Sequence, residues 1–153
     1  MDVRIELDDL TDPRIAAFLE AHIQDMRSVS PPESKHALDL AGLKRPEISF
    51  WSVWSGQTLV GCGAIKRLDP AHAELKSMRT APSHRRRGLG ALILNFLMEE
   101  ARRRGYRRMS LETGSMPFFV PARTLYAKHG FVPCPPFDGY REDPNSAFMT
   151  REL

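Results

Sequence analysis

Apolar and polar residues alternate along several short stretches of the chain, and this two-residue period predicts β-strands. In "VRIELDDL", Val3, Ile5 and Leu7 alternate with mostly charged residues. The β-rich runs "ISFWSVWS" and "TLVGCGAIKRL" are separated by Gly56 and Gln57, which predicts a hairpin. The further strands expected from the same pattern are "AELKSMRT", "RRMSLET", "FVPC" and "SAFMTREL".

Other stretches carry apolar residues at intervals of three and four, the period of an amphipathic helix. Asp12 followed by Pro13 is typical of a helix start, and the apolar stripe behind them predicts a helix to about Arg27. Further helices are expected over about 33–43, from Gly88 to near Gly105, and in "PARTLYAKHG", which ends at Gly130. This order of elements predicts an α/β (α+β) fold, in which helices cover a mixed sheet.

Composition narrows the class of protein. A chain of 153 residues predicts one domain, 1–153, and a net charge of +3 is too mild to indicate a nucleic-acid binder by itself. Cys62 and Cys134 lack a CxxC partner, so neither a zinc ribbon nor a disulfide framework is indicated. With acids in place of a basic leader and no long apolar run, we expect a cytoplasmic protein without a membrane partner.

The stretch "SHRRRGLGALILNFL" joins a predicted strand to the long predicted helix. The first N–H groups of a helix have no internal partner, and glycines let an anion approach them, so Gly88 and Gly90 favour a phosphate site. The stretch is neither a dinucleotide fingerprint, which needs a third glycine, nor a Walker loop, which needs Gly-Lys-Ser/Thr. A solvated basic face beside a helix is the alternative for Arg85, Arg86 and Arg87.

Two segments resemble the GNAT family of acyl-CoA-dependent N-acyltransferases. "MRTAPSHRRRGLGALIL" is similar to the family's strand, Arg-x-x-Gly-x-Gly loop and helix, and "PARTLYAKHGF" to its later Ala-x-x-Leu-Tyr-x-x-x-Gly-Phe segment. The resemblance is most specific over 74–131 and is closest to small bacterial acetyltransferases. It implies a GNAT fold with a mostly antiparallel sheet, splayed between strands 4 and 5, which are expected to end at Thr80 and Thr113.

The resemblance also implies acetyl-CoA as co-substrate, and no metal. The loop would hold the pyrophosphate through backbone N–H groups and forked arginine donors, and the preceding strand would bind pantetheine through its backbone. The expected cofactor-binding residues are Met78, Arg79, Thr80, Arg85, Arg86, Arg87, Gly88, Leu89, Gly90 and Ala91. Phe119 stands where the family often has Asn, so we expect an apolar wall from "PFFVP" instead of a side-chain hydrogen bond.

A primary amine is mostly protonated at neutral pH, so attack on a thioester needs a base. The resemblance nominates Glu74, and strand alternation predicts its side chain on the same face as those of Lys76, Met78 and Thr80. A solvent-facing glutamate paired with Lys76 is an equally open interpretation. The family position of Tyr126 implies a general acid for the departing thiolate, and its alternative is an amphipathic helix tyrosine.

The resemblance implies an acceptor site between the first helix region, the later strands and the C-terminal hairpin. The residues nominated for it are Glu33, Ser34, His36, Phe118 and Arg123, each of which an ordinary structural role also explains. A zinc deaminase signature at "HAE" and Pro133-Cys134 is incomplete, because Phe137 stands where its second cysteine belongs.

Together these features predict direct acetyl transfer from acetyl-CoA to a primary amine, which we expect on a small molecule, in a ternary complex. Neither cysteine occupies an expected nucleophile position. Two alternatives belong to other classes. A basic nucleic-acid-binding module would use residues 85–87 and 102–108, but no aromatic residues are interleaved with these arginines. A non-catalytic CoA sensor is the second. The acceptor's identity and a homodimeric state stay open.

Overall fold

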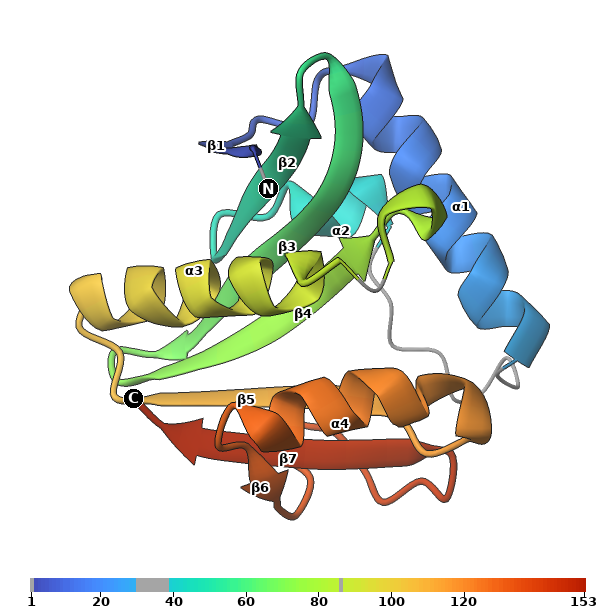
Figure 1. Ribbon diagram of the computed structural model, residues 1–153. Helices are drawn as coiled ribbons and strands as arrows, with labels where there is room; N and C mark the ends of the chain where they lie inside the picture. The colour runs from blue at the N-terminus through green and yellow to red at the C-terminus, as the bar shows by residue number, and fades with distance from the viewer. Residues whose placement is uncertain (1, 30–38, 86) are drawn as a thin grey trace.

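The computed structural model describes residues 2–29, 39–85 and 87–153 (Figure 1). They form a seven-stranded sheet in the order β1-β2-β3-β4-β5-β7-β6. The strands are β1 (Arg4–Leu7), β2 (Ile48–Ser55), β3 (Thr58–Asp69), β4 (His72–Thr80), β5 (Arg108–Gly114), β6 (Val132–Pro133) and β7 (Ser146–Glu152). Among these strands only β4 and β5 pair in parallel, so the expected mixed, mostly antiparallel sheet is confirmed.

Helices cover both faces of the sheet, with α3 and α4 on one side and α1 and α2 on the other (Figure 1). The helices are α1 (Pro13–Val29), α2 (Leu40–Leu43), α3 (Leu89–Arg103) and α4 (Val120–Lys128), with short 3-10 turns η2 (Pro82–His84) and η3 (Pro117–Phe119). The predicted α1, α3 and α4 are confirmed. Of the helix expected over 33–43, the described part contains α2, and positions 33–38 lie outside the described residues.

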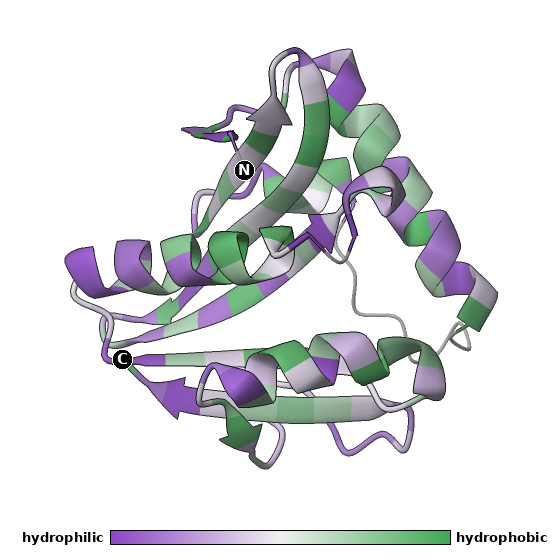
Figure 2. Ribbon diagram, viewed as in Figure 1, coloured by the Kyte–Doolittle hydropathy of each residue, from purple (hydrophilic) through white to green (hydrophobic). Residues whose placement is uncertain are grey.

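Two hydrophobic clusters hold these layers together. Beneath α3 and α4, residues such as Ile65, Leu97 and Leu111 are almost fully buried, and Leu19 and Phe50 are buried in the second cluster against α1. Figure 2 shows α3 hydrophobic where it crosses the sheet and hydrophilic at its C-terminal end. Because burial of one such side chain stabilises the fold by about 1.5–3 kcal/mol, these clusters fix the helices that surround the site.

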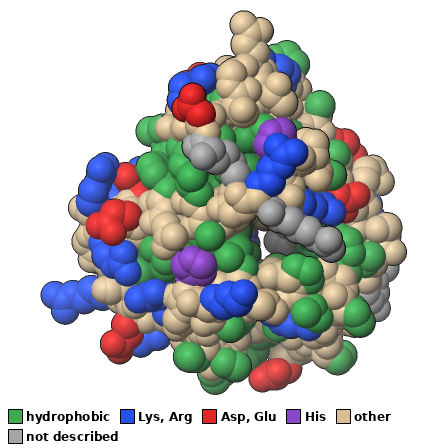
Figure 3. Space-filling view, in the orientation of Figure 1, with side chains coloured by type: hydrophobic (Ala, Val, Ile, Leu, Met, Phe, Trp, Pro, Cys, Tyr) green, Lys and Arg blue, Asp and Glu red, His purple; other side chains and the backbone are tan. Residues whose placement is uncertain are grey.

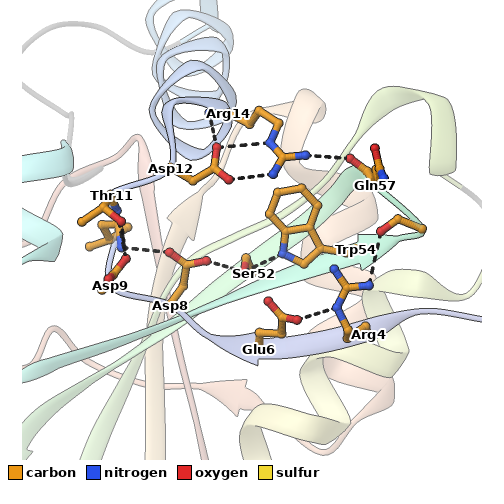
Figure 4. Close-up of polar contacts among 12 residues, drawn as sticks. Arg4, Glu6, Asp8, Asp9, Thr11, Asp12, Arg14, Ser52, Trp54 and Gln57 are labelled. Carbon is orange, nitrogen blue, oxygen red and sulfur yellow. Dashed lines mark hydrogen bonds and ion pairs between the residues drawn. The ribbon is translucent and has the colours of Figure 1, made fainter.

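The start of α1 is anchored to β2 by a polar corner (Figure 4). Asp12 accepts a hydrogen bond from the backbone N–H of Arg14 at 2.8 Å, which confirms the predicted helix start. The Arg14 guanidinium also lies 4.4 Å from the centre of the Trp54 ring. The Trp54 indole donates to Ser52, which in turn donates to Asp8 at 2.6 Å. This corner holds α1 on its face of the sheet.

The arginines at the end of α3 are largely ion-paired. Glu100 pairs with Arg104, as the spacing predicts, and also with Arg103. Glu99 and Arg103 have the same i,i+4 spacing, which also predicts an ion pair, but that prediction is wrong because Glu99 pairs with Arg102, one residue closer in the sequence. Figure 3 shows Lys and Arg side chains mixed with Asp and Glu at this end of the molecule.

The sheet splays open between β4 and β5. The two strands pair at three positions only, ending with Glu74 opposite Ser110, and then diverge (Figure 1). The predicted splay between strands 4 and 5 is therefore confirmed.

The other edge of β4, which pairs with β3, contains a β-bulge. The register between the two strands shifts between Cys62 and Ala64, and Ser77 has a φ of 53°. The Cys62 thiol donates a hydrogen bond to the Ser77 carbonyl at 3.1 Å.

Candidate active site

A cavity of about 480 Å³ lies in the splay, within the size range of small-molecule sites. Its walls come from the second half of β4, the end of β5, the C-terminal half of α1, the loop before α3, and the segment from η3 into α4. Three of these elements, β4, the loop before α3 and α4, carry the cofactor-binding and catalytic residues predicted from the sequence. The cavity therefore brings the two predicted groups of residues to one site.

The loop before α3 presents bare backbone to this cavity. Gly88 is the N-cap residue with a φ of 78°, and its carbonyl accepts from the Leu92 N–H at 3.1 Å, so the three preceding helix amides have no partner within the helix. Gly88 and Gly90 both line the cavity. A Cβ on Gly90 would lie 3.2 Å from Leu125, whereas one on Gly88 would meet nothing within 4 Å. A side chain at position 90 is therefore disfavoured by lack of space, whereas one at position 88 is disfavoured by the backbone conformation.

The other predicted loop residues take different positions. Arg85 lines the cavity, Arg87 is exposed, and Arg86 lies outside the described residues. The Leu89 side chain is buried in the first hydrophobic cluster, so only its backbone is available to a ligand. Ala91 is the third residue of α3 and is half-buried.

The bulge at Ser77 changes which face of the sheet the end of β4 serves. The expected alternation, with Met78 and Thr80 on the face of Glu74, is wrong beyond the bulge. Met78 packs against the cluster beneath α3, and Arg79 instead contacts α1. One extra residue reverses the alternation, so Met78 and Thr80 face the loop side of the cavity.

Glu74 is the centre of a buried polar cluster, called here the Glu74 cluster, with Lys76 and Tyr140. Its side chain is 2% exposed, and Oε2 accepts hydrogen bonds from Lys76 Nζ at 3.0 Å and the Tyr140 hydroxyl at 2.6 Å. Glu74 does pair with Lys76, but it is not solvent-facing. Oε1 is buried, and no described residue hydrogen-bonds to it. One carboxylate oxygen is thus fixed by protein donors while the other is available to a ligand.

Tyr140 was not nominated from the sequence. It lies in the segment between β6 and β7, 66 positions from Glu74, and its ring packs against Phe137 and Phe148. Burial and the neighbouring Glu74 carboxylate raise the pKa of the Tyr140 hydroxyl, which keeps it protonated and able to donate. No local motif marks this contact, because only the path of the later chain brings the two side chains together.

Glu112 is a second carboxyl group on the cavity wall that sequence reasoning missed. It lies on β5 and accepts a hydrogen bond from the Ser146 hydroxyl at 2.7 Å. Burial raises its pKa to about 7, although the Ser146 hydrogen bond opposes the shift. Near neutral pH this group can therefore both hold and release a proton.

Tyr126 lines the same cavity from α4. It is 7% exposed, and its ring packs against Phe131 at 5.9 Å between centres. Burial, with a smaller contribution from Glu112, raises the pKa of its hydroxyl to about 12. The ring thus packs in the core as an amphipathic helix tyrosine would, and the hydroxyl is held protonated beside the cavity.

The residues nominated for the acceptor divide into three groups. Phe118 lines the cavity. Phe119, expected only as part of an apolar wall, lines it as well, and its ring occupies the space that a side chain on Gly114 would need. Arg123 does not line the cavity. Its guanidinium donates to the backbone carbonyls of Gly114 at 2.6 Å and Met116 at 3.1 Å, so it braces the end of β5. Glu33, Ser34 and His36 lie outside the described residues.

The cysteines are placed away from this chemistry. Burial raises the pKa of the Cys62 thiol to about 12, and neither Cys62 nor Cys134 lines the cavity. Within residues 2–29, 39–85 and 87–153, no group of three or more His, Cys, Asp or Glu side chains could hold a metal ion. The helices of that same part of the chain are all too short or too polar to cross a membrane.

A family model described as "Acetyltransferase (GNAT) family" matches residues 15–131. The chain belongs to the GNAT family. Two relatives are similar in sequence to this chain over almost its whole length. The uncharacterized N-acetyltransferase YsnE of Bacillus subtilis (strain 168) is 53% identical over 151 residues, covering 99% of this chain and 100% of the relative. The uncharacterized N-acetyltransferase YedL of Escherichia coli (strain K12) is 50% identical over 97% of this chain and 94% of its own. The protein is an N-acetyltransferase of this family.

Solved GNAT structures share the fold. A protein described as an acyl-CoA N-acyltransferase from Klebsiella pneumoniae has a TM-score of 0.77 and 29% identity over 99% of this chain and 97% of its own. A GNAT acetyltransferase from Elizabethkingia anophelis, solved with acetyl-CoA bound, has a TM-score of 0.67 and 16% identity over 99% and 98% of the two chains.

Proposed function

We propose that this GNAT enzyme transfers the acetyl group of acetyl-CoA directly to the primary amine of a small molecule in a ternary complex. One observation carries the proposal: a single cavity is lined by the bare loop before α3, the buried carboxylate of Glu74 and the hydroxyl of Tyr126. The unpaired amides of the loop favour an anionic ligand, the Glu74 carboxylate can accept a proton, and the Tyr126 hydroxyl can donate one.

Acetyl-CoA would enter from the loop side. The amides of residues 88–91 would donate to the pyrophosphate, with Arg85, Arg86 and Arg87 adding charged donors around it. Pantetheine would follow the backbone of Met78, Arg79 and Thr80 into the splay. Phe118 and Phe119 would supply an apolar wall beside it, consistent with the absence of asparagine at position 119. The relative from Elizabethkingia anophelis, which has acetyl-CoA bound, supports this co-substrate for the shared fold.

Proton transfer would begin at Glu74. Oε1 of Glu74 would accept one proton from the substrate ammonium, either directly or through water, while Lys76 and Tyr140 hold Oε2. The free amine would then attack the thioester carbon, and a backbone N–H near Met78 would stabilise the oxyanion.

As the carbon–sulfur bond breaks, Tyr126 would protonate the thiolate and recover its proton from the nitrogen of the new amide through water. One acetyl group moves, one CoA thiol forms, and one proton is released overall.

Glu112 is a second candidate for the base. Its pKa of about 7 matches a group that accepts a proton near neutral pH, and it lines the cavity from the opposite strand. Separate Glu74→Gln and Glu112→Gln variants distinguish the two, because only the true base should lower kcat strongly while acetyl-CoA binding is retained.

The experiment that tests the function is a thiol-release assay with acetyl-CoA against a library of amines, next to calorimetry with CoA alone. Acetylation of a small amine, with formation of the amide checked by mass spectrometry, is the expected result. CoA binding without turnover of any amine would favour a sensor. Salt-sensitive oligonucleotide binding without CoA affinity would favour the nucleic-acid alternative, which the ion pairing of residues 102–104 already weakens.

A further inference from the structure

Arg79 forms a second polar cluster at the other end of the cavity, called here the Arg79 cluster, with His22 and Asp25 of α1. Its Nη1 donates to Asp25 Oδ2 at 2.9 Å and to His22 Nδ1 at 3.2 Å, and its guanidinium lies 5.4 Å from the centre of the Phe18 ring. All three members of the cluster line the cavity. The side chain of Arg79 is 7% exposed, so a full positive charge is held in the wall of the cavity.

The positive charge of Arg79 is only partly balanced. Asp25 is 45% exposed, so water competes for its carboxylate. His22 accepts the hydrogen bond from Arg79 and is neutral, because burial and the Arg79 charge lower its pKa to about 4. In addition, Nε of Arg79 is buried, and no described residue accepts its hydrogen. A buried donor without a partner is unfavourable, so this N–H favours the binding of a ligand's acceptor atom.

The opposite end of the cavity has the opposite polarity. Glu74 Oε1 is likewise buried without a partner, and Glu112 lies on the facing strand. Lys76 is committed at that end, because it donates to both Glu74 and Tyr140. At about 3.3 Å per residue, the Cα atoms of Glu74 and Arg79 are roughly 15 Å apart, and both side chains extend several ångströms from the strand. Because both residues line the same cavity, one acceptor molecule can contact Arg79 with one group while its amine reaches Glu74, directly or through water.

From this arrangement we propose that the acceptor is an amino acid or a similar amine that also carries a carboxylate, and that Arg79 binds the carboxylate while Glu74 receives the amine's proton. The inference rests on the proposed function and names its substrate class. The side chain of Arg79 serves the acceptor, although its backbone lies along the proposed pantetheine path, because the bulge at Ser77 turns this side chain toward α1 while Met78 and Thr80 face the loop.

A matched panel of substrates tests this directly. Glycine, 4-aminobutyrate, 6-aminohexanoate and 8-aminooctanoate, which increase the separation of amine and carboxylate, are compared, by kcat/KM with acetyl-CoA, with their primary amides. Loss of the carboxylate charge lowers the pKa of the amine, so in solution the amide is the better nucleophile at neutral pH. We expect at least one carboxylate to exceed its amide by tenfold or more in the wild-type enzyme. Equal rates for every pair would overturn the inference and leave the proposed function standing.

Two variants then separate recognition from a structural tie between β4 and α1. Arg79→Gln removes the charge of the side chain. The ratio of kcat/KM for the carboxylate to kcat/KM for its amide is then expected to fall to about one, with unchanged CoA affinity. Asp25→Asn breaks the same ion pair but keeps the guanidinium, so the ratio is expected to stay or rise, because a competing anion has been removed. If both variants lose the preference equally, Arg79 only tethers α1 and the inference is wrong.

Thermal unfolding checks that both variants are folded. If Arg79→Gln does not fold, Arg79→Lys replaces it, with an intermediate ratio expected and an unchanged ratio contradicting the inference. Loss of CoA affinity in a folded Arg79 variant would assign Arg79 to the cofactor and overturn the inference. Failure of the wild-type enzyme to acetylate any amine while binding CoA would reject the proposed function itself.

Discussion

The loop before α3 and the Glu74 cluster lie at the same cavity but are built in opposite ways. The loop is contiguous in sequence, offers backbone groups, and depends on two residues without side chains, Gly88 and Gly90. The Glu74 cluster joins side chains from β4 and from the segment before β7, 66 positions apart, in a buried hydrogen-bond network. Local chain geometry is therefore enough to form the loop, whereas the Glu74 cluster forms only in the tertiary fold.

The largest effect is expected from the loop. A Gly88→Ala/Gly90→Val double variant strains a residue with a φ of 78° and pushes a side chain toward Leu125, so CoA affinity measured by calorimetry should fall at least 100-fold. Gly56→Ala is the matched control, because Gly56 has a φ of 60°, open space around it and a position in the β2–β3 hairpin. Unchanged CoA affinity in the folded double variant would remove the loop from the proposed site.

The next effect is expected from the Glu74 cluster itself. Glu74→Gln keeps the shape of the side chain but removes the proton acceptor, so kcat should fall about 100-fold to 1,000-fold with CoA affinity unchanged. Glu112→Gln is the matched variant on the facing strand and should retain most activity. The reverse result would make Glu112 the base.

A smaller loss is expected for Tyr126→Phe. The ring still packs against Phe131, but no hydroxyl remains to protonate the thiolate, so kcat should fall roughly 10-fold to 100-fold while the acetyl-CoA Kd stays constant. Tyr106→Phe, in a tyrosine that packs against the same hydrophobic cluster, is the control. Full activity in Tyr126→Phe would exclude Tyr126 as the acid.

Tyr140→Phe should have a still smaller effect, because it removes one of two donors that hold Glu74 Oε2. We expect kcat to fall about 10-fold, with KM for acetyl-CoA unchanged, in the same steady-state assay. A loss as large as that of Glu74→Gln would mean that Tyr140 takes part in proton transfer and does more than position the carboxylate.

The smallest effect concerns stability, and it has opposite signs at the two ends of the cavity. The folded-state pKa of Glu112 is raised from 4.5 to about 7, so its contribution to the unfolding free energy falls as pH rises through that window. The pKa of His22 is lowered from 6.5 to about 4, so its contribution falls as pH drops through that window. In urea unfolding, the stability of Glu112→Gln relative to the wild-type protein should increase as the pH rises toward 7. The relative stability of His22→Gln should increase as the pH falls toward 4. Parallel pH profiles for all three proteins would contradict these assignments.

The comparison also explains how far the sequence could lead. The strands, three of the helices and the Arg-x-x-Gly-x-Gly loop follow from periodicity and a contiguous motif, and they were predicted. The splay was predicted only from the resemblance to the GNAT family. Tyr140 and Glu112 were missed because their proximity to the site depends on how β5 and the segment before β7 fold back, which no local pattern records. The alternation beyond Ser77 was wrong because a bulge depends on the partner strand, here through the contact with Cys62.

The bulge at Ser77 also decides where the charge of Arg79 lies. Before the bulge, Leu75 packs beneath α3; after it, Met78 packs there, and Arg79 contacts α1 instead. If the same residues formed a regular strand, strict alternation would put Met78 on the α1 side and Arg79 beneath α3. The buried positive charge in the cavity wall therefore depends on a single extra residue whose own side chain carries no charge.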